Sequence, residues 1–233
     1  MDIRKKVASV CVCILIATST TGCVWWHKLW GKEEQAKETP EILYQKGNEA
    51  YQKEKYDKAI EAFQRVKEQY PLSELAIMAE LGIADSHFSN EEYTEAELSY
   101  SDFLNMHPTN ANLPYVMYQL GLCHYKQISS IDRDQTETIK ALKEFERLTS
   151  RFPDSKLSLL AEKKIHECRR LLAEKEFYIG HFYFKRKLYK AALARFETIQ
   201  KMYPGVGADY KIAYFIQETK QRLGNEKTET KTP

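Results

Sequence analysis

The sequence predicts an all-α protein, a solenoid of about four to five stacked helix hairpins. One pattern of small and aromatic residues recurs four times along the 233-residue chain. No stretch alternates apolar and polar residues in the manner of a β-strand, and glycine and proline are rare, at 9 and 7 residues. A recurring pattern of this kind indicates repeated supersecondary units that bury a continuous core by stacking.

The pattern places an alanine three residues after its first position, an aromatic residue four residues later and a proline eight residues after that. Its four copies are Tyr56, Ala59, Phe63 and Pro71; Tyr93, Ala96, Tyr100 and Pro108; Thr138, Ala141, Phe145 and Pro153; and Tyr189, Ala192, Phe196 and Pro204. Residues three and four apart share one helix face, so the alanine admits a neighbouring helix and the aromatic ring fills the space beside it. The proline has no backbone N–H and lies at or beyond the helix end.

A second register precedes each copy and predicts the first helix of every hairpin. Its small residues are Gly47, Ala84, Gly121 and Gly180. The first three are 37 residues apart. The pattern resembles the tetratricopeptide repeat, in which units of about 34 residues form such hairpins.

Two insertions modify the third and fourth repeats. A loop of residues 128–137 separates the helices of repeat three and contains Asp132, Arg133 and Asp134. An uninterrupted apolar periodicity then predicts one long helix from about Ser155 to Arg186. A last helix at residues 208–223 is expected to cap the solenoid.

The N-terminus has the features of an export signal and an anchor. Basic residues at positions 4–6 precede an apolar run at 7–17, which is too short to span a bilayer. The following segment, 19–23, resembles a bacterial lipobox, and the resemblance implies that Cys23 is lipidated and that Val24 after it directs the protein to the outer membrane. The alternative is an ordinary signal peptide with a chance cysteine. We therefore expect a signal peptide at 1–22, a lipidated tether at 23–40, the solenoid at 41–223 and a disordered polar tail at 224–233.

Three tryptophans, Trp25, Trp26 and Trp30, follow the lipidation site directly. Tryptophan is favoured at membrane interfaces, and a second contact would reinforce a lipid anchor. The alternative is that these rings pack on the first repeat. Removal of residues 1–22, which carry three basic side chains and one acidic one, takes the formal charge from +2 to zero. This balance does not indicate nucleic-acid binding, which usually requires a basic face.

The middle of the chain resembles BamD-type lipoproteins of the outer-membrane β-barrel assembly machinery. The resemblance rests on residues 107–110, 113, 115–118 and 121–122, on 132–134 and on 151–155. The loop insertion, the long helix and the N-terminal lipidation site also match. The resemblance implies two partners, a BamA-type barrel subunit and unfolded barrel precursors that present a C-terminal targeting segment. It also implies that the N-terminal repeats act on substrate and the C-terminal repeats on the machinery.

Two sets of residues are candidates for these contacts. Aromatic and aliphatic residues of the first helices are expected to line a concave peptide groove: Tyr44, Tyr51, Leu81, Phe88, Tyr118 and Tyr125. Such side chains recur at binding hot spots, although each ring also fits the core between repeats. A basic cluster near the turn within repeat four is a candidate for docking an acidic partner: Lys185, Arg186, Lys187, Lys190 and Arg195. The alternative for this cluster is a solvated turn.

Catalytic and metal-binding patterns are missing from the sequence. His87 and His124 share one register, and hydrogen-bonded histidines at helix ends are favoured over a metal site, because no ligand spacing supports one. Cys123 and Cys168 lie on apolar helix faces, which favours buried thiols over a disulfide. We expect no enzyme activity and no cofactor other than the lipid on Cys23. The competing hypotheses are a pilotin-like lipoprotein that assists a secretin, and a cell-wall enzyme or its activator.

Overall fold

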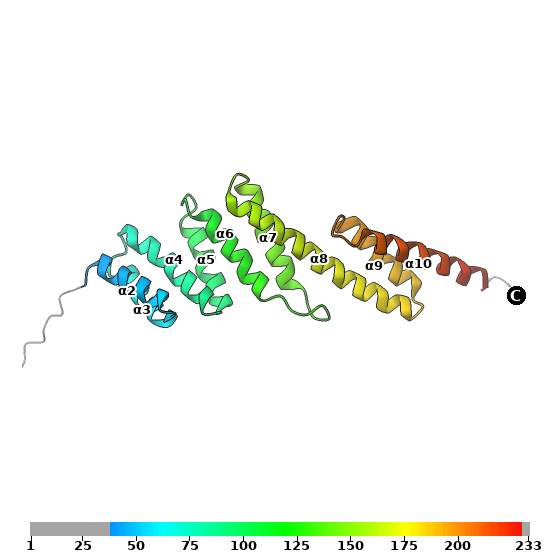
Figure 1. Cartoon of the computed structure of the whole chain (residues 1–233), viewed down its shortest axis with the longest axis horizontal. Coiled ribbons are helices and arrows are strands. Elements are labelled where there is room, and N and C mark those ends of the chain that lie inside the picture. Colours follow the sequence, from blue (N-terminus) through cyan, green and yellow to red (C-terminus); the bar gives the residue numbers. More distant parts are fainter. Residues whose placement is uncertain (1–37, 230–233) are drawn as a thin grey trace, which may run out of the picture. The chain divides into compact units, whose positions relative to one another are not determined.

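The computed structural model describes residues 38–229, and all the regular elements in this range are helices (Figure 1). In chain order they are α2 (Pro40–Gln52), α3 (Tyr56–Gln69), α4 (Glu74–Ser89), α5 (Tyr93–Met106), α6 (Leu113–Lys126), α7 (Thr136–Arg151), α8 (Lys156–Lys185), α9 (Tyr189–Met202) and α10 (Asp209–Glu229). Each helix packs on the next, and α2 also contacts α4 as α6 contacts α8. The predicted stack of helix hairpins is confirmed. Within 38–229, no helix has the length and apolar character needed to cross a membrane.

The repeated alanines and aromatic rings form the contacts that join the helices. Ala59, Ala96, Ala141 and Ala192 are fully buried, and Phe63, Tyr100, Phe145 and Phe196 are at most 1% exposed. The helices approach so closely that a Cβ added at Gly47 or Gly82 would lie 2.5 or 2.6 Å from the ring of Phe63. Glycine is therefore required on both helices that enclose this ring, because any side chain at these two positions would overlap the ring.

Helix ends follow the sequence signals at most positions. The prolines of the pattern each lie two residues beyond their helix, which ends at Gln69, Met106, Arg151 or Met202. Ser73 and Ser155 cap α4 and α8, and each Oγ accepts a hydrogen bond from the backbone N–H two residues later at 3.2 Å. The turns within three hairpins contain a residue with positive φ that is not glycine, namely Glu54, Glu91 and Lys187. None of these three turns contains a glycine, so the sequence did not indicate their left-handed residue.

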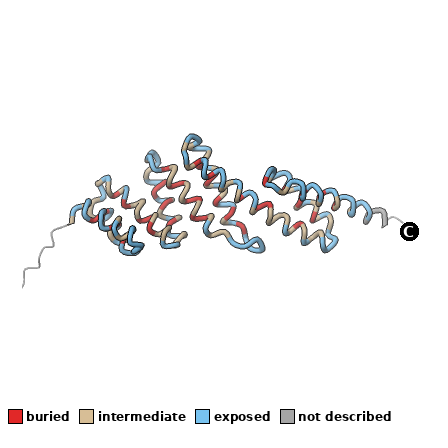
Figure 2. The backbone as a smooth tube through the Cα atoms, in the orientation of Figure 1, coloured by how far each residue is buried: buried red, intermediate tan, exposed pale blue. Residues whose placement is uncertain are grey.

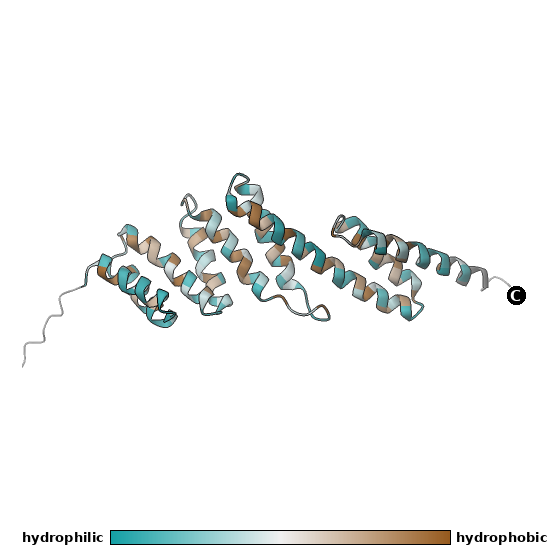
Figure 3. Ribbon diagram, viewed as in Figure 1, coloured by the Kyte–Doolittle hydropathy of each residue, from teal (hydrophilic) through white to brown (hydrophobic). Residues whose placement is uncertain are grey.

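The buried residues form three clusters along the helix contacts (Figure 2). The first, with Leu43 and Phe63, joins α2, α3 and α4; the central one runs from α4 to α8; and the third joins α8, α9 and α10. Helix α8 belongs to two of them, since Cys168 lies in the central cluster and Ala173 in the third. Beyond its first turns α10 is mainly hydrophilic (Figure 3).

Element boundaries differ from the predictions by small amounts. The long helix is Lys156–Lys185, with Ser155 and Arg186 as its caps. The loop insertion is shorter than predicted, because α7 already begins at Thr136. The last helix continues to Glu229, so residues 224–229 of the expected disordered tail are helical. The expectations for the signal peptide, Cys23 and the tryptophans fall outside the described residues.

Candidate peptide groove and partner surface

A pocket of about 230 Å³ lies between α2 and α4 near the N-terminal end of the described helices. It brings together three of the six predicted groove residues, Tyr44 and Tyr51 from α2 and Leu81 from α4. Its other lining residues are Asn48, Phe63, Met78, Gly82, Asp85 and Asn112. Gly47 of the repeat pattern and Gly82, which lies outside it, allow α2 and α4 to approach Phe63 and so position this pocket.

Residues of α3 and the end of α4 hold the two tyrosine rings of the pocket in place. The Tyr44 ring packs on Phe63 with a centroid separation of 5.4 Å. The Tyr51 ring meets Tyr56 edge-on at 5.6 Å, and its hydroxyl shares a 2.8 Å hydrogen bond with Ser89 Oγ at the end of α4. Rings fixed in this way bind with little loss of side-chain entropy.

An acidic residue that the sequence analysis did not single out lies on the pocket wall. Asp85 Oδ1 accepts hydrogen bonds from Tyr100 Oη at 2.5 Å and from Tyr115 Oη at 2.7 Å. Gln119 Nε2 donates to Tyr115 Oη at 2.9 Å, which fixes that ring. Burial raises the pKa of Asp85, although both hydroxyl hydrogen bonds act in the opposite direction. The sequence signal was an acidic residue directly after the buried Ile83 and Ala84 on an apolar helix face.

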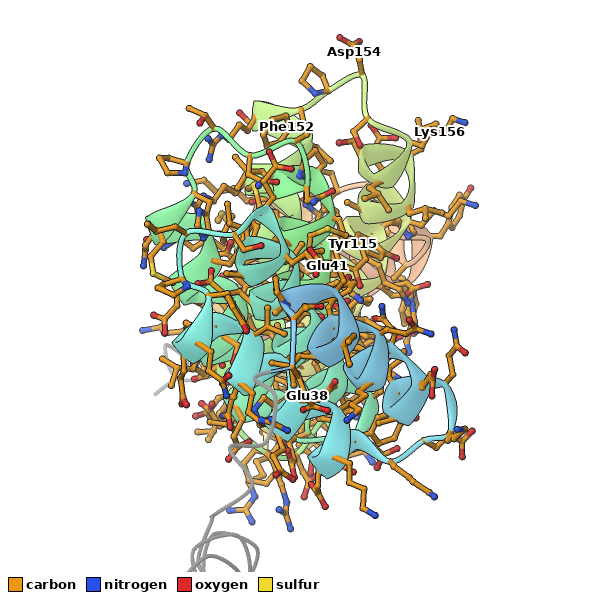
Figure 4. The ribbon with its side chains drawn as sticks, turned by 90° about the vertical axis from the view of Figure 1, so that its left-hand side faces the viewer. Glu38, Glu41, Tyr115, Phe152, Asp154 and Lys156 are labelled. Carbon is orange, nitrogen blue, oxygen red and sulfur yellow. The ribbon has the colours of Figure 1, made fainter. Side chains whose placement is uncertain are left out.

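The view along the helix stack from α2 shows Tyr115 near its middle, whereas Asp154 and Lys156 project at the edge (Figure 4). Tyr115 lies on α6, and its hydroxyl reaches α4 by its hydrogen bond to Asp85. The Asp85 carboxylate therefore ties α4 to both α5 and α6 while it forms part of the pocket wall.

The other three predicted groove residues do not line this pocket. Phe88 meets Tyr93 edge-on at 5.5 Å, and Tyr118 packs on Phe145 at 5.7 Å. Tyr125 donates a 2.7 Å hydrogen bond to Glu167 Oε2 of α8. These rings contact neighbouring helices of the stack, and the predicted row of six is not brought together in one groove.

Four of the five predicted docking residues surround the turn between α8 and α9. Lys185, Arg186, Lys187 and Lys190 are all exposed, and the Arg186 guanidinium lies 4.6 Å above the Phe182 ring. Arg195 differs, because its guanidinium is 3.0 Å from Glu176 on α8 and half-buried. Because Glu176 neutralises its charge within the fold, Arg195 is no longer counted among the docking residues.

A second pocket, of about 380 Å³, lies between α8 and the start of α10. Phe177, Tyr178 and Ile212 contribute to its apolar wall, and Lys211 Nζ lies 3.9 Å above the Phe177 ring. The His181 ring stacks on Phe177, and its pKa is lowered by burial and by the nearby Lys185 and Lys211. This pocket is a result of the long α8 helix, and the sequence analysis did not identify it.

The histidines and cysteines have structural surroundings. His87 Nδ1 is 2.7 Å from Glu92 and His124 Nδ1 is 2.8 Å from Glu137, so both are hydrogen-bonded at helix ends as predicted. No group of three or more potential metal ligands occurs within residues 38–229. Cys123 and Cys168 are buried free thiols, and burial raises the pKa of each to about 12.

Comparison with known proteins identifies relatives over most of the chain. A BamD outer membrane protein assembly factor of Rickettsia prowazekii is 35% identical over 182 residues, which cover 78% of this chain and 72% of that protein. The Haemophilus influenzae BamD is 26% identical over 94% of this chain and 86% of its own. Similarity to solved structures is low: the TPR2AB domain of yeast Sti1, solved as a pHSP90 complex, has a TM-score of 0.46 at 15% identity and covers 79% of this chain and 70% of that one.

The family model of the YfiO outer membrane lipoproteins matches residues 36–232, which include every helix described above. Together with the Rickettsia relative, this match covers the repeats, the loop insertion and the long α8 helix. The chain therefore belongs to the YfiO family of outer membrane lipoproteins, as the BamD-type resemblance of its sequence predicted.

Proposed function

We propose that this protein is an outer-membrane-anchored scaffold of the β-barrel assembly machinery, held on the periplasmic face by a lipid on Cys23. In this function it binds a BamA-type barrel subunit and the C-terminal targeting segments of unfolded outer-membrane proteins. The assembly-factor names of its relatives support the first part of the proposal. Members of this group are non-enzymatic interaction proteins, so binding is the whole of the proposed mechanism.

The pocket between α2 and α4 is the observation that carries the substrate part of the proposal. Its volume is below the 300–1,000 Å³ typical of small-molecule sites, so it suits one side chain of an extended peptide better than a cofactor. Tyr44 and Tyr51 offer fixed ring faces, and Met78, 47% exposed, offers a flexible apolar surface. A targeting segment would place one side chain here while its backbone runs along the helices.

The basic turn between α8 and α9 is proposed as the docking surface for the barrel subunit. Its four exposed cations lie next to Phe182, which is 47% exposed, and Leu188, which is 51% exposed. Apolar residues surrounded by like charges are typical of protein interfaces in which charge sets the rate and orientation of docking. The surface therefore fits an acidic periplasmic partner.

Affinity purification of the full chain from detergent-solubilised outer membranes tests this function. We expect a BamA-type barrel subunit to co-purify, and added peptides with an aromatic C-terminus to bind the purified chain. A matched control is the Tyr51→Ala variant, which is expected to retain the subunit and lose affinity for the peptide. Recovery of a secretin in place of the barrel subunit would favour the pilotin-like alternative. That alternative is not favoured here, because a pilotin is expected to lack the loop insertion and the long α8 helix.

A further inference from the structure

The pocket between α2 and α4 has one charged group among its lining residues, and that group is negative. The described residues that line it include no lysine, arginine or histidine to balance Asp85. Both hydroxyls that bond to Asp85 donate to the same oxygen, Oδ1. The structure thus uses one half of the carboxylate to join helices and leaves the other half without a described hydrogen-bond partner.

The second oxygen, Oδ2, is not sealed in the protein interior. Within residues 38–229, no fully buried side-chain oxygen or nitrogen lacks a hydrogen-bond partner, so an unpartnered Oδ2 must be accessible. Asp85 also lines the pocket, so its carboxylate stands at the space where a peptide side chain would enter. A negative charge in partly desolvated surroundings attracts a cation more strongly than one in bulk water.

The surrounding side chains suit the long stem of a basic residue. Lysine and arginine carry an aliphatic chain that packs on apolar surface while the charged head reaches a polar partner. Met78 and Leu81 supply that surface, and the rings of Tyr44 and Tyr51 supply the negative faces that attract cations. The remaining polar groups, on Asn48 and Asn112, are uncharged and repel no cation.

We infer that the pocket between α2 and α4 recognises a lysine or arginine of an unfolded substrate segment, with Asp85 Oδ2 as the acceptor for the cationic head. This inference rests on the proposed substrate-binding function and makes Asp85 the residue that sets its charge preference. The occupant is therefore an extended peptide that places one basic side chain between the tyrosines. An aromatic side chain in the pocket instead is an alternative that the test below separates.

The test measures binding of the full chain, in detergent, to fluorescent peptides that share one unfolded barrel-strand sequence. A single guest position, moved along the peptide, carries lysine, arginine, glutamine, glutamate or phenylalanine. At one guest position we expect lysine and arginine to bind about tenfold more tightly than glutamine at low salt, and glutamate to bind most weakly. The preference should fall with added salt, because the charges are screened.

The variant Asp85→Asn removes the charge and keeps an oxygen that accepts from Tyr100 and Tyr115. It should abolish the preference for lysine and arginine, so that the lysine, arginine and glutamine peptides bind this variant within about twofold of one another. The matched control is Asp102→Asn on α5, which removes the same charge from an exposed position outside the pocket and should retain the preference. Unchanged helical circular dichroism of both variants confirms that they are folded.

Other results would contradict the charge preference, the role of Asp85 or the peptide-binding function itself. Equal binding of all guest residues by the wild-type chain would contradict the charge preference and leave the peptide-binding function standing, as would selection of an aromatic guest residue alone. A preference that persists in Asp85→Asn would place the cation elsewhere. Absence of binding by every peptide would contradict both the inference and the substrate part of the proposed function.

Discussion

At the scale of single residues, small side chains decide how closely the helices approach. Ala192 is fully buried against its neighbours, whereas Ala194, two residues later on α9, is exposed. We expect Ala192→Leu to lower the free energy of unfolding by about 1–3 kcal/mol, because the added carbons overpack a helix contact. Ala194→Leu adds the same atoms to the same helix and should change stability by less than about 0.5 kcal/mol. Urea unfolding of both variants makes the comparison, and equal stabilities would contradict the repeat alignment.

Asp85 provides a second prediction at this scale, through its titration. Because its pKa is raised in the folded protein, the native state binds this proton more tightly than the unfolded chain does. Its contribution to stability is therefore greatest in acid, falls as pH rises past the ordinary value of 3.8, and stays low above the raised pKa. We expect the stability of Asp85→Asn relative to wild type to increase between pH 3.5 and pH 7, as measured by urea unfolding at several pH values. A difference that is constant with pH would show that the carboxylate is not desolvated.

The same residue shows what the sequence predicted and what it did not. The regular spacing of Ala59, Phe63 and their equivalents predicted the hairpins, because helix contacts depend on residues three and four apart. Asp85 bonds to Tyr100 and Tyr115, which are 15 and 30 residues away, and no local pattern indicates such a contact. The six predicted groove residues occupy two repeat registers seven residues apart, and these registers give only a helix face. The neighbouring helices decide which of them meet at a pocket.

At the scale of helices, α8 connects two buried clusters. Arg170 lies between Cys168, in the central cluster, and Ala173, in the third, and its exposed side chain pairs with Glu174. We expect Arg170→Pro to cost about 3 kcal/mol or more, because proline removes a helix hydrogen bond and clashes with the preceding turn. It should also separate the unfolding of α9 and α10 from that of α4–α7, because the interrupted helix no longer joins the clusters.

Hydrogen exchange measures this separation helix by helix. The control Arg170→Ala keeps the helix and removes only the exposed ion pair, which contributes at most about 1 kcal/mol. If α9 and α10 in the proline variant keep the protection of the alanine variant, a continuous α8 is not what couples the two clusters.

Helix α8 was predicted within one residue at each end, because Ser155 is a strong N-cap signal and apolar residues recur through the helix. The end of α10 was predicted six residues too early. The polar residues after Leu223 have no apolar periodicity, so the sequence pattern did not indicate that the helix continues through them.

At the scale of the whole molecule, attachment to the membrane is predicted to depend on the lipid at Cys23. We expect Cys23→Ser to leave the isolated protein in the soluble fraction after mixing with phospholipid vesicles, because the variant has no acyl chain to insert. Flotation of the vesicles with wild-type and variant protein measures this, and mass spectrometry of the wild type identifies the lipid. Full flotation of the variant at high salt would identify another anchor, such as the adjacent tryptophans.

The division of labour between the two ends of the repeats is the last prediction. Tyr44 and Tyr51 line the pocket between α2 and α4, and Arg186 and Lys190 lie beside the turn between α8 and α9. We expect Tyr44→Ala with Tyr51→Ala to weaken peptide binding and leave docking of the BamA-type subunit intact. Arg186→Glu with Lys190→Glu should weaken docking instead. The remaining affinity should depend less on salt, because the opposite-charge contact that salt would screen is gone.

The second pair replaces exposed side chains only and leaves the Arg195–Glu176 ion pair in place, so the fold is not expected to change. Titration of each folded variant with both the peptide and the periplasmic domains of the barrel subunit distinguishes the two surfaces. Two separate losses would establish that substrate is received at one end of the repeats while the machinery is held at the other. Equal loss of both activities in both variants would mean instead that peptide and subunit share one continuous surface, because a change anywhere in a shared site affects both ligands.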